Sequence, residues 1–295
     1  MTTNKFVGTG VAIVTPFRND GNIDFISLGN LVEYQIANGV NYIVVMGTTG
    51  ESATLSKEER QAVIKHVCDV NARRVPVVAG FGGNNTQDIV QQIKDFKGFD
   101  HVDAILSVAP YYNKPSQHGL FLHYQSIASV SPVPVIIYNV PGRTSVNIDA
   151  ETTLKIAREI NNVIAVKEAS GNMDQIMTII KNKPDGFMVI SGDDALTLPM
   201  IQMGGDGVIS VIGNAYPKEW SDMVNHALNG ENKQALEIHY QMLDLVKNIF
   251  TEGNPAGIKA VLDLKNLVPN NLRLPLISVS ESHYTNLSKL VNQLS

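Results

Sequence analysis

Short apolar runs recur at regular intervals along the first two thirds of the chain. Eight runs rich in valine and isoleucine lie at residues 10–15, 41–46, 75–80, 103–108, 133–138, 162–167, 186–191 and 206–211. Continuous apolar runs of this length are typical of strands that are buried on both faces of a parallel sheet. The sequence therefore predicts eight buried strands.

Segments with helical periodicity separate these runs, and residues 56–70 are an example. Ser56 and Glu59 have the spacing of a helix capping box. An apolar stripe on one helix face follows, made of Val63, Ile64, Val67 and Cys68. Eight alternating strand and helix units predict an α/β fold of the (β/α)8 type, a TIM barrel, in preference to an open doubly wound sheet.

The strand pattern stops after residue 217, and only helical patterns continue from there. We expect residues 1–225 to form the barrel with the active site and residues 226–295 to form a C-terminal helical domain. Long Gly/Ser linkers are absent from the sequence, so the two parts should pack together.

Composition narrows the class of protein. The 295 residues are 44% hydrophobic, and 23 Lys and Arg against 28 Asp and Glu give a net charge of −5. Basic blocks and long apolar runs are both missing, which argues against nucleic-acid and membrane partners. Met1–Gly10 does not resemble a leader, and a single cysteine, Cys68, fits a reducing compartment. We expect a cytoplasmic protein.

In a TIM barrel the chemistry lies at the carboxyl ends of the strands. The second apolar run leads into GTTGES at 47–52, whose backbone N–H groups could form a nest for a carboxylate or phosphate. A plain glycine turn explains the same residues equally well, since the tract has neither P-loop nor GxGxxG spacing.

The sixth run ends in Lys167, after four apolar residues at 163–166. Burial lowers the pKa of a lysine and yields a neutral amine that can attack a carbonyl and form a Schiff base. The alternative is a buried ion pair with a carboxylate on a neighbouring strand. The position at the barrel mouth favours the nucleophile.

Polar residues also follow the fourth and fifth runs. Tyr138 could move protons beside an amine and Arg143 could bind a carboxylate, or they could be a core aromatic and a surface charge. Tyr111 and Tyr112 could serve the site or an interface. Metal chemistry finds little support, because the seven histidines are scattered and none has ligand spacing.

Four motifs occur together and in order: GTTGES at 47–52, YNVPGRT at 138–144, VKEASG at 166–171 and SGDD at 191–194. In this arrangement, from about Phe6 to the C-terminal helices, the chain resembles the dihydrodipicolinate synthase family of class I pyruvate-dependent lyases and synthases. The resemblance implies catalytic and binding residues. The implied catalytic residues are Lys167 as the Schiff-base lysine, Tyr138 as the proton donor, and Thr48 and Tyr112 as the rest of a proton relay. The implied binding residues are Thr49, Gly192 and Ile209 for pyruvate and Arg143 for the carboxylate of the second substrate.

The implied reaction joins pyruvate to aspartate 4-semialdehyde and gives 4-hydroxy-tetrahydrodipicolinate, without a metal or organic cofactor. The resemblance also implies a homodimer or homotetramer in which Tyr112 reaches a neighbouring subunit. Lys167 and Tyr138 are shared with N-acetylneuraminate lyase and 2-keto-3-deoxy sugar acid aldolases, so these remain alternatives, and only Arg143 separates them. A non-enzymatic barrel that binds a keto acid would lack the nucleophile.

Many family members bind lysine as an inhibitor at the subunit interface, and sensitive members supply histidines there. Lys57 and Arg60 stand at the matching positions, and two cations would repel the ammonium group of lysine. Residues that still match the pocket are Ser52, Ala53, Asn84 and Tyr111, with Asp88 near the expected acidic position. We expect weak or absent inhibition, unless Lys57 and Arg60 point to solvent.

Overall fold

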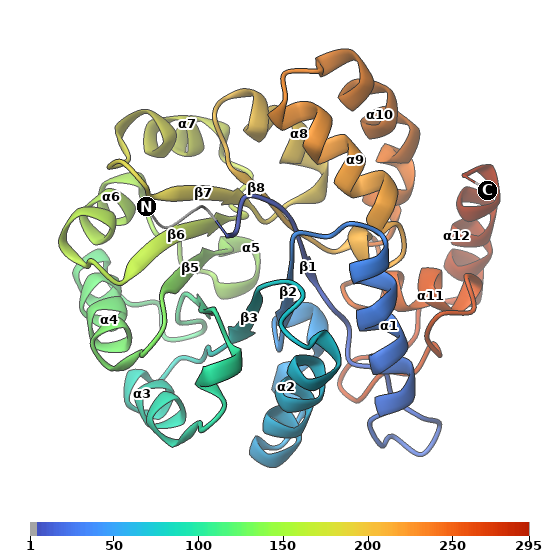
Figure 1. The fold of residues 1–295 in the computed structure, drawn as a ribbon, viewed down its shortest axis with the longest axis horizontal. Coiled ribbons are helices and arrows are strands. Elements are labelled where there is room, and N and C mark those ends of the chain that lie inside the picture. Colours follow the sequence, from blue (N-terminus) through green and yellow to red (C-terminus); the bar gives the residue numbers. More distant parts are fainter. Residues whose placement is uncertain (1–4, 295) are drawn as a thin grey trace.

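Eight parallel strands form a closed barrel in which each strand pairs with its neighbours in sequence and β8 pairs with β1 (Figure 1). The computed structural model describes residues 5–294. The strands are β1 (Gly8–Ala12), β2 (Tyr42–Val45), β3 (Val77–Gly80), β4 (Ala104–Val108), β5 (Val135–Asn139), β6 (Val163–Glu168), β7 (Met188–Ser191) and β8 (Gly207–Ser210). The predicted TIM barrel is confirmed. The expectation that Met1–Gly10 is not a leader falls partly on residues 1–4, which lie outside the described residues.

Helices surround the strands, as the alternating pattern predicts. They are α1 (Phe25–Ala37), α2 (Lys57–Asn71), α3 (Thr86–Asp95), α4 (Gln117–Val130), α6 (Ala150–Glu159), α7 (Met173–Asn182), α8 (Thr197–Gln202) and α9 (Pro217–Leu228). The capping box of Ser56 and Glu59 begins α2, and the predicted apolar stripe of that helix is buried. A short helix, α5 (Pro141–Thr144), follows β5 at the mouth of the barrel.

The alternation of side chains along the strands creates two apolar layers. On β5, Ile136 and Tyr138 belong to the cluster inside the barrel, whereas Ile137 belongs to the larger cluster between strands and helices. Strand residues that face inward at the carboxyl end therefore reach the barrel mouth. Their neighbours in sequence face the helices.

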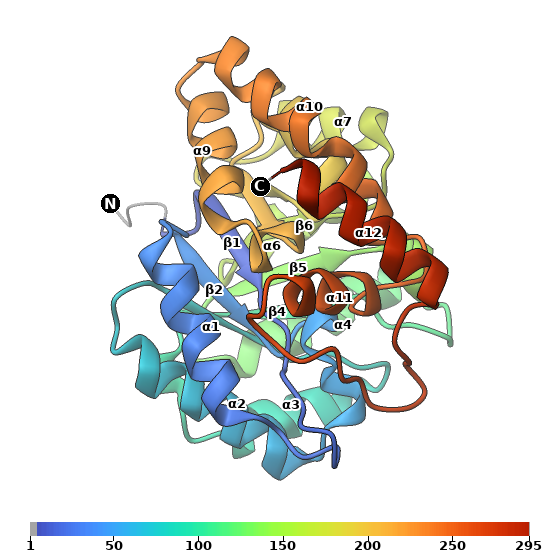
Figure 2. The ribbon, with the colours of Figure 1, turned by 90° about the vertical axis from the view of Figure 1, so that its right-hand side faces the viewer.

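The C-terminal helices α10 (Asn232–Asn248), α11 (Ala256–Leu264) and α12 (Glu281–Gln293) gather on one side of the barrel (Figures 1 and 2). The predicted boundary at residue 225 falls within α9, and the division into two domains stays a prediction. Residues 265–280 form no helix, which corrects the expectation of a purely helical tail. Within residues 5–294, no helix combines the length and apolarity that a membrane crossing requires.

Candidate active site

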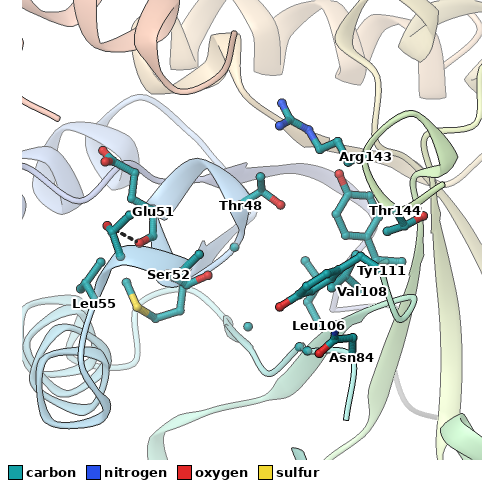
Figure 3. A pocket seen from close by; sticks show the side chains of 18 of the residues that line it. Thr48, Glu51, Ser52, Leu55, Asn84, Leu106, Val108, Tyr111, Arg143 and Thr144 are labelled. Carbon is teal, nitrogen blue, oxygen red and sulfur yellow. Dashed lines mark hydrogen bonds between the residues drawn. The ribbon is translucent and has the colours of Figure 1, made fainter. Parts of the chain in front are cut away.

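A cavity of about 600 Å³ opens beside the carboxyl ends of the strands. Thr48, Tyr138 and Arg143 line it, together with residues of the loops after β3 and β4. Figure 3 shows Glu51 and Ser52 on one wall, with Arg143 and Tyr111 on the wall opposite. The structure thus places side chains from distant parts of the sequence around one space.

Lys167 lies near the end of β6 and is only 5% exposed. Burial lowers the pKa of its amine from 10.5 to about 7, because an ammonium ion loses its hydration there. The carboxylate of Asp194 opposes this effect, and the positive charge of Arg143 adds to it. A substantial fraction of the amine is therefore neutral and nucleophilic near neutral pH.

The alternative of a buried ion pair does not hold for Lys167. Among residues 5–294, the carboxylates that form ion pairs all do so with other cations. A second buried lysine shows the contrast, because Lys259 pairs with Glu51 and both side chains are fully buried. Lys167 is thus a buried amine that forms no ion pair with any carboxylate of residues 5–294, although Asp194 acts on it at longer range.

Tyr138 is the neighbour of Lys167 across the β5–β6 pairing, and both follow residues that face the helices, Ile137 and Val166. The Lys167 Nζ atom lies 4.3 Å from the centroid of the Tyr138 ring. Burial raises the pKa of the phenol to about 12, although Arg143 and a hydrogen bond with Thr48 lower it. The phenol keeps its proton at neutral pH and can donate it.

Thr48 and Thr49 lie in a 3-10 turn, η1 (Thr48–Gly50), directly after β2. The amides of Gly50 and Glu51 donate to the carbonyls of Gly47 and Thr48 at 3.1 Å each. Those two N–H groups are already satisfied, which supports a plain turn over an anion nest at these positions. Thr49 is buried, while Thr48 lines the cavity.

Of the three residues expected to contact pyruvate, Gly192 lies beside the lysine and Ile209 lies in the barrel interior. A Cβ atom at Gly192 would lie 2.9 Å from the Cε atom of Lys167, so only glycine leaves room for this side chain. Ile209 on β8 belongs to the cluster inside the barrel. Gly192, Ile209 and Thr49, like Lys167 itself, are not among the residues that line the cavity of about 600 Å³.

Arg143 and Tyr112 occupy exposed positions. Arg143, on α5, borders the cavity and forms no ion pair with any carboxylate of the described chain. Tyr112 is 87% exposed with a φ of 75°, and its neighbour Tyr111 lines the cavity instead. The structure therefore does not bring Tyr112 into the site of its own chain.

The C-terminal part contributes residues that the sequence pattern did not reveal. The Nδ2 group of Asn254 donates to the Thr49 hydroxyl at 2.9 Å, across 205 positions of sequence. The buried Glu51–Lys259 pair joins the same turn to α11. Asp194 is also buried, and its Oδ2 atom accepts hydrogen bonds from Val211 and the next residue at 2.9 Å each. For Asn254 and Lys259, polar type was the only sequence signal, whereas Glu51 and Asp194 lie within the GTTGES and SGDD motifs.

The far end of the cavity contains the residues expected to match the lysine pocket. They are Ser52, Ala53, Asn84, Asp88 and Tyr111. Arg60 lines this end too, with its Nη1 atom 3.5 Å from the Oε1 atom of Gln92. The expectation for Lys57 is wrong, because its ammonium group pairs with Asp95 of α3 at 2.7 Å and does not line the cavity.

Residues 5–294 contain no group of three or more His, Cys, Asp or Glu side chains that could hold a metal ion. The histidines instead make isolated contacts. His123, for example, is hydrogen-bonded to Thr86 at 2.8 Å, and burial lowers the pKa of its ring to about 4.

Fold and site together define a (β/α)8 barrel with a buried lysine and a tyrosine paired at its mouth, an arrangement suited to a Schiff-base-forming lyase. The chain belongs to the dihydrodipicolinate synthetase family, whose model matches residues 5–294. The 4-hydroxy-tetrahydrodipicolinate synthase of Parabacteroides distasonis is 51% identical over 98% of this chain and 97% of that protein. The Bacillus subtilis enzyme of the same name is 44% identical over 98% of this chain and 100% of its own.

Solved structures agree with this assignment. The dihydrodipicolinate synthase from Aquifex aeolicus superimposes on this chain with a TM-score of 0.93 at 41% identity, and the match covers 98% of each chain. The DHDPS from Cyanidioschyzon merolae, solved with lysine bound, superimposes with a TM-score of 0.94 at 37% identity and covers 99% of both chains. Family membership and the predicted fold are therefore confirmed.

Proposed function

We propose that this chain condenses pyruvate with aspartate 4-semialdehyde to give 4-hydroxy-tetrahydrodipicolinate, on the route to diaminopimelate and lysine. One observation carries the proposal. Lys167 is a buried amine that has no carboxylate partner among the described residues, with a pKa lowered to about 7, and it lies against the Tyr138 ring. A carbonyl compound in this position would meet a nucleophile and a proton donor together.

In the first step the neutral amine of Lys167 attacks the keto carbon of pyruvate. The resulting carbinolamine loses water and becomes a protonated imine. Tyr138 supplies the proton that the departing oxygen needs, and the hydrogen bond with Thr48 connects the phenol to the cavity. Thr49, Gly192 and Ile209 surround the pyruvate.

In the second step the Tyr138 phenolate formed in the first step takes a proton from the pyruvate methyl group, and the imine becomes an enamine. The enamine carbon attacks the aldehyde carbon of the semialdehyde, forming a carbon–carbon bond, and Tyr138 protonates the new alkoxide. Arg143 binds the carboxylate of this second substrate. The substrate's own amine then attacks the imine carbon, releases Lys167 as the neutral amine and returns a proton to the Tyr138 phenolate. The protonated imine accepts the electron pair throughout, so the mechanism requires no metal or organic cofactor.

We assign Tyr112 to the proton relay of a neighbouring subunit in a homodimer or homotetramer. Its exposure of 87% and its φ of 75° present the ring away from its own chain. Mixing Lys167→Ala chains with Tyr112→Phe chains should restore some turnover, because one site of a mixed dimer would be complete. Failure to complement, with subunit exchange verified, would indicate that Tyr112 acts within its own chain.

We also propose that lysine inhibits this chain weakly. Arg60 lines the far end of the cavity and would face the ammonium group of the ligand, although Asp88 lines the same end. Lys57 does not face the ligand, since its ammonium group pairs with Asp95. We place the reaction in the cytoplasm, where the buried free thiol of Cys68 would stay reduced.

Borohydride reduction in the presence of pyruvate tests the covalent step. The adduct should map to the peptide containing Lys167, and both Lys167→Ala and Lys167→Arg should abolish it, since a guanidinium stays protonated. An adduct on another lysine would refute the assignment. Parallel assays with aspartate 4-semialdehyde and with N-acetylneuraminate test the substrate, and turnover of N-acetylneuraminate alone would favour the sugar acid lyases.

A further inference from the structure

A second polar pair lies directly behind the Tyr138–Lys167 pair. Asn139 follows Tyr138 on β5, Glu168 follows Lys167 on β6, and the two are partners in the strand register. Successive strand residues point to opposite faces, so Asn139 and Glu168 point toward the helices. Both side chains are fully buried. The proposed chemistry uses neither of them.

Glu168 is surrounded by hydrogen-bond donors. Its carboxylate accepts from Asn139 Nδ2 at 3.2 Å to each oxygen, from Gln175 Nε2 at 3.1 Å and from the Ser170 amide at 2.8 Å. Burial raises the pKa of Glu168, while these hydrogen bonds lower it. Because every partner donates, the site suits an ionised carboxylate, for which hydrogen bonds are strong. A buried carboxylate without a cation is costly, so its partners must be well fixed.

The amide side chains of Asn139 and Gln175 also hold the end of the loop after β5. Asn139 Oδ1 accepts from the Ile148 amide at 2.9 Å, and Asn139 Nδ2 donates to Asn147 Oδ1 at 2.8 Å. Gln175, on α7, accepts from Asn147 Nδ2 at 2.8 Å and donates to the Ile148 carbonyl at 3.2 Å. Residues 147–148 are therefore connected through these amides to Glu168.

That loop, residues 140–148, contains α5 and Arg143. The Arg143 side chain is exposed and makes no hydrogen bond or ion pair within residues 5–294. The loop backbone therefore sets where this side chain starts, without support from another side chain. Lys167 and Tyr138, in contrast, lie within the barrel strands. Loosening the loop should displace Arg143 and leave the lysine in place.

We propose that Glu168 is a positioning residue for the second substrate: its carboxylate orients Asn139 and Gln175, and these fix the loop that carries Arg143. The proposal rests on the proposed function, in which Arg143 binds a carboxylate of the second substrate. It assigns the specificity for that substrate partly to a buried group that touches neither substrate.

The test variant is Glu168→Gln, which keeps the shape but turns an acceptor oxygen into a donor that faces other donors. The KM for aspartate 4-semialdehyde should rise about ten-fold or more, the size expected when hydrogen bonds to a charged group are lost. The KM for pyruvate and the extent of borohydride trapping should stay unchanged. Asn162→Ala is the matched control, because Asn162 Nδ2 donates to the carbonyls of Ala128, Ser131 and Val133 just before β6 begins. This control should lose stability without a change in either KM.

Gln175→Ala provides a milder second variant if Glu168→Gln does not fold, and it should raise the same KM. An unchanged KM for the semialdehyde in a folded variant would overturn the proposal. Equal increases for both substrates, or the same increase in Asn162→Ala, would also overturn it. Wild-type protein that forms no pyruvate adduct would instead refute the proposed function, so the two failures are distinguishable.

Discussion

The two buried lysines should respond in opposite ways to the same substitution. We expect Lys167→Met to raise the free energy of unfolding near neutral pH and Lys259→Met to lower it. Methionine approximates the length of lysine and removes its charge. The difference arises from the surroundings, because Glu51 pairs with Lys259 and no carboxylate of the described chain pairs with Lys167.

The pKa values give the size of the effect. The pKa of Lys167 is 10.5 ordinarily and about 7 in the folded chain. Between these values the unfolded chain binds more protons than the folded chain, so stability rises with pH across this window. The free-energy cost of burying the charged Lys167 amine is fully present below pH 7 and disappears above pH 10.5. At neutral pH it amounts to about 4 kcal/mol, which methionine avoids.

For Lys259→Met we expect the opposite change, a lower free energy of unfolding. Removing its charge leaves the Glu51 carboxylate buried without a counterion, which costs about 3–5 kcal/mol. The double substitution Glu51→Met with Lys259→Met removes both charges. It should recover much of that loss, because an apolar pair of similar volume can replace a buried ion pair.

Urea unfolding provides the measurement, and the single tryptophan, Trp220, is buried in α9 and reports on it. Wild type and variants should be compared at equal protomer concentration, at pH 7 and at about pH 9.5, because association also affects stability. The advantage of Lys167→Met should shrink at the higher pH. A variant less stable than wild type at pH 7, or an advantage independent of pH, would refute the reasoning.

Three further predictions concern the site. The rate of pyruvate adduct formation, measured by borohydride trapping at timed intervals, should rise between about pH 6 and 8 and then level off, because it follows the pKa of Lys167. A rate that continues to rise toward about pH 10 would contradict this prediction. Gly192→Ala should slow adduct formation at least roughly ten-fold, because the new Cβ would meet Lys167 Cε at 2.9 Å. Gly142→Ala, where a Cβ meets nothing within 4 Å, is the control and should not slow it. High millimolar lysine should leave turnover largely unchanged, whereas Arg60→Ala should become more sensitive; submillimolar half-inhibition of wild type would contradict this.

The strand pattern was sufficient to predict the barrel because both faces of each strand are buried. Each apolar run marks a strand, and the next polar residue marks the mouth, which is how Lys167 and Tyr138 could be predicted. The hydrophobic pattern of a sequence says less about the direction in which a long side chain points. Lys57 was expected to face the cavity, but the oppositely charged Asp95 on the neighbouring helix α3 holds its ammonium group instead.

Contacts from the C-terminal part could not be predicted for a different reason. Residues 265–280 have no periodic structure, yet Arg273 from this segment binds Glu59 through both guanidinium Nη atoms, at 2.8 and 2.6 Å. Asn254 reaches the hydroxyl of Thr49 at 2.9 Å. Periodicity describes neighbours along one element, and these contacts join elements more than 200 residues apart.

The two buried lysines show where sequence patterns stop being informative about chemistry. Lys167 follows four apolar residues of a predicted strand, whereas Lys259 lies in a helical pattern that does not by itself predict its burial. Both side chains are nevertheless buried. Burial lowers the pKa of each amine, to about 7 and about 8. Only the partner differs: Glu51, 208 positions away, neutralises Lys259, which also donates to the Asn271 carbonyl. A lysine's reactivity therefore depends on which carboxylates the fold places beside it, and that becomes visible only when the barrel and the C-terminal helices are seen together.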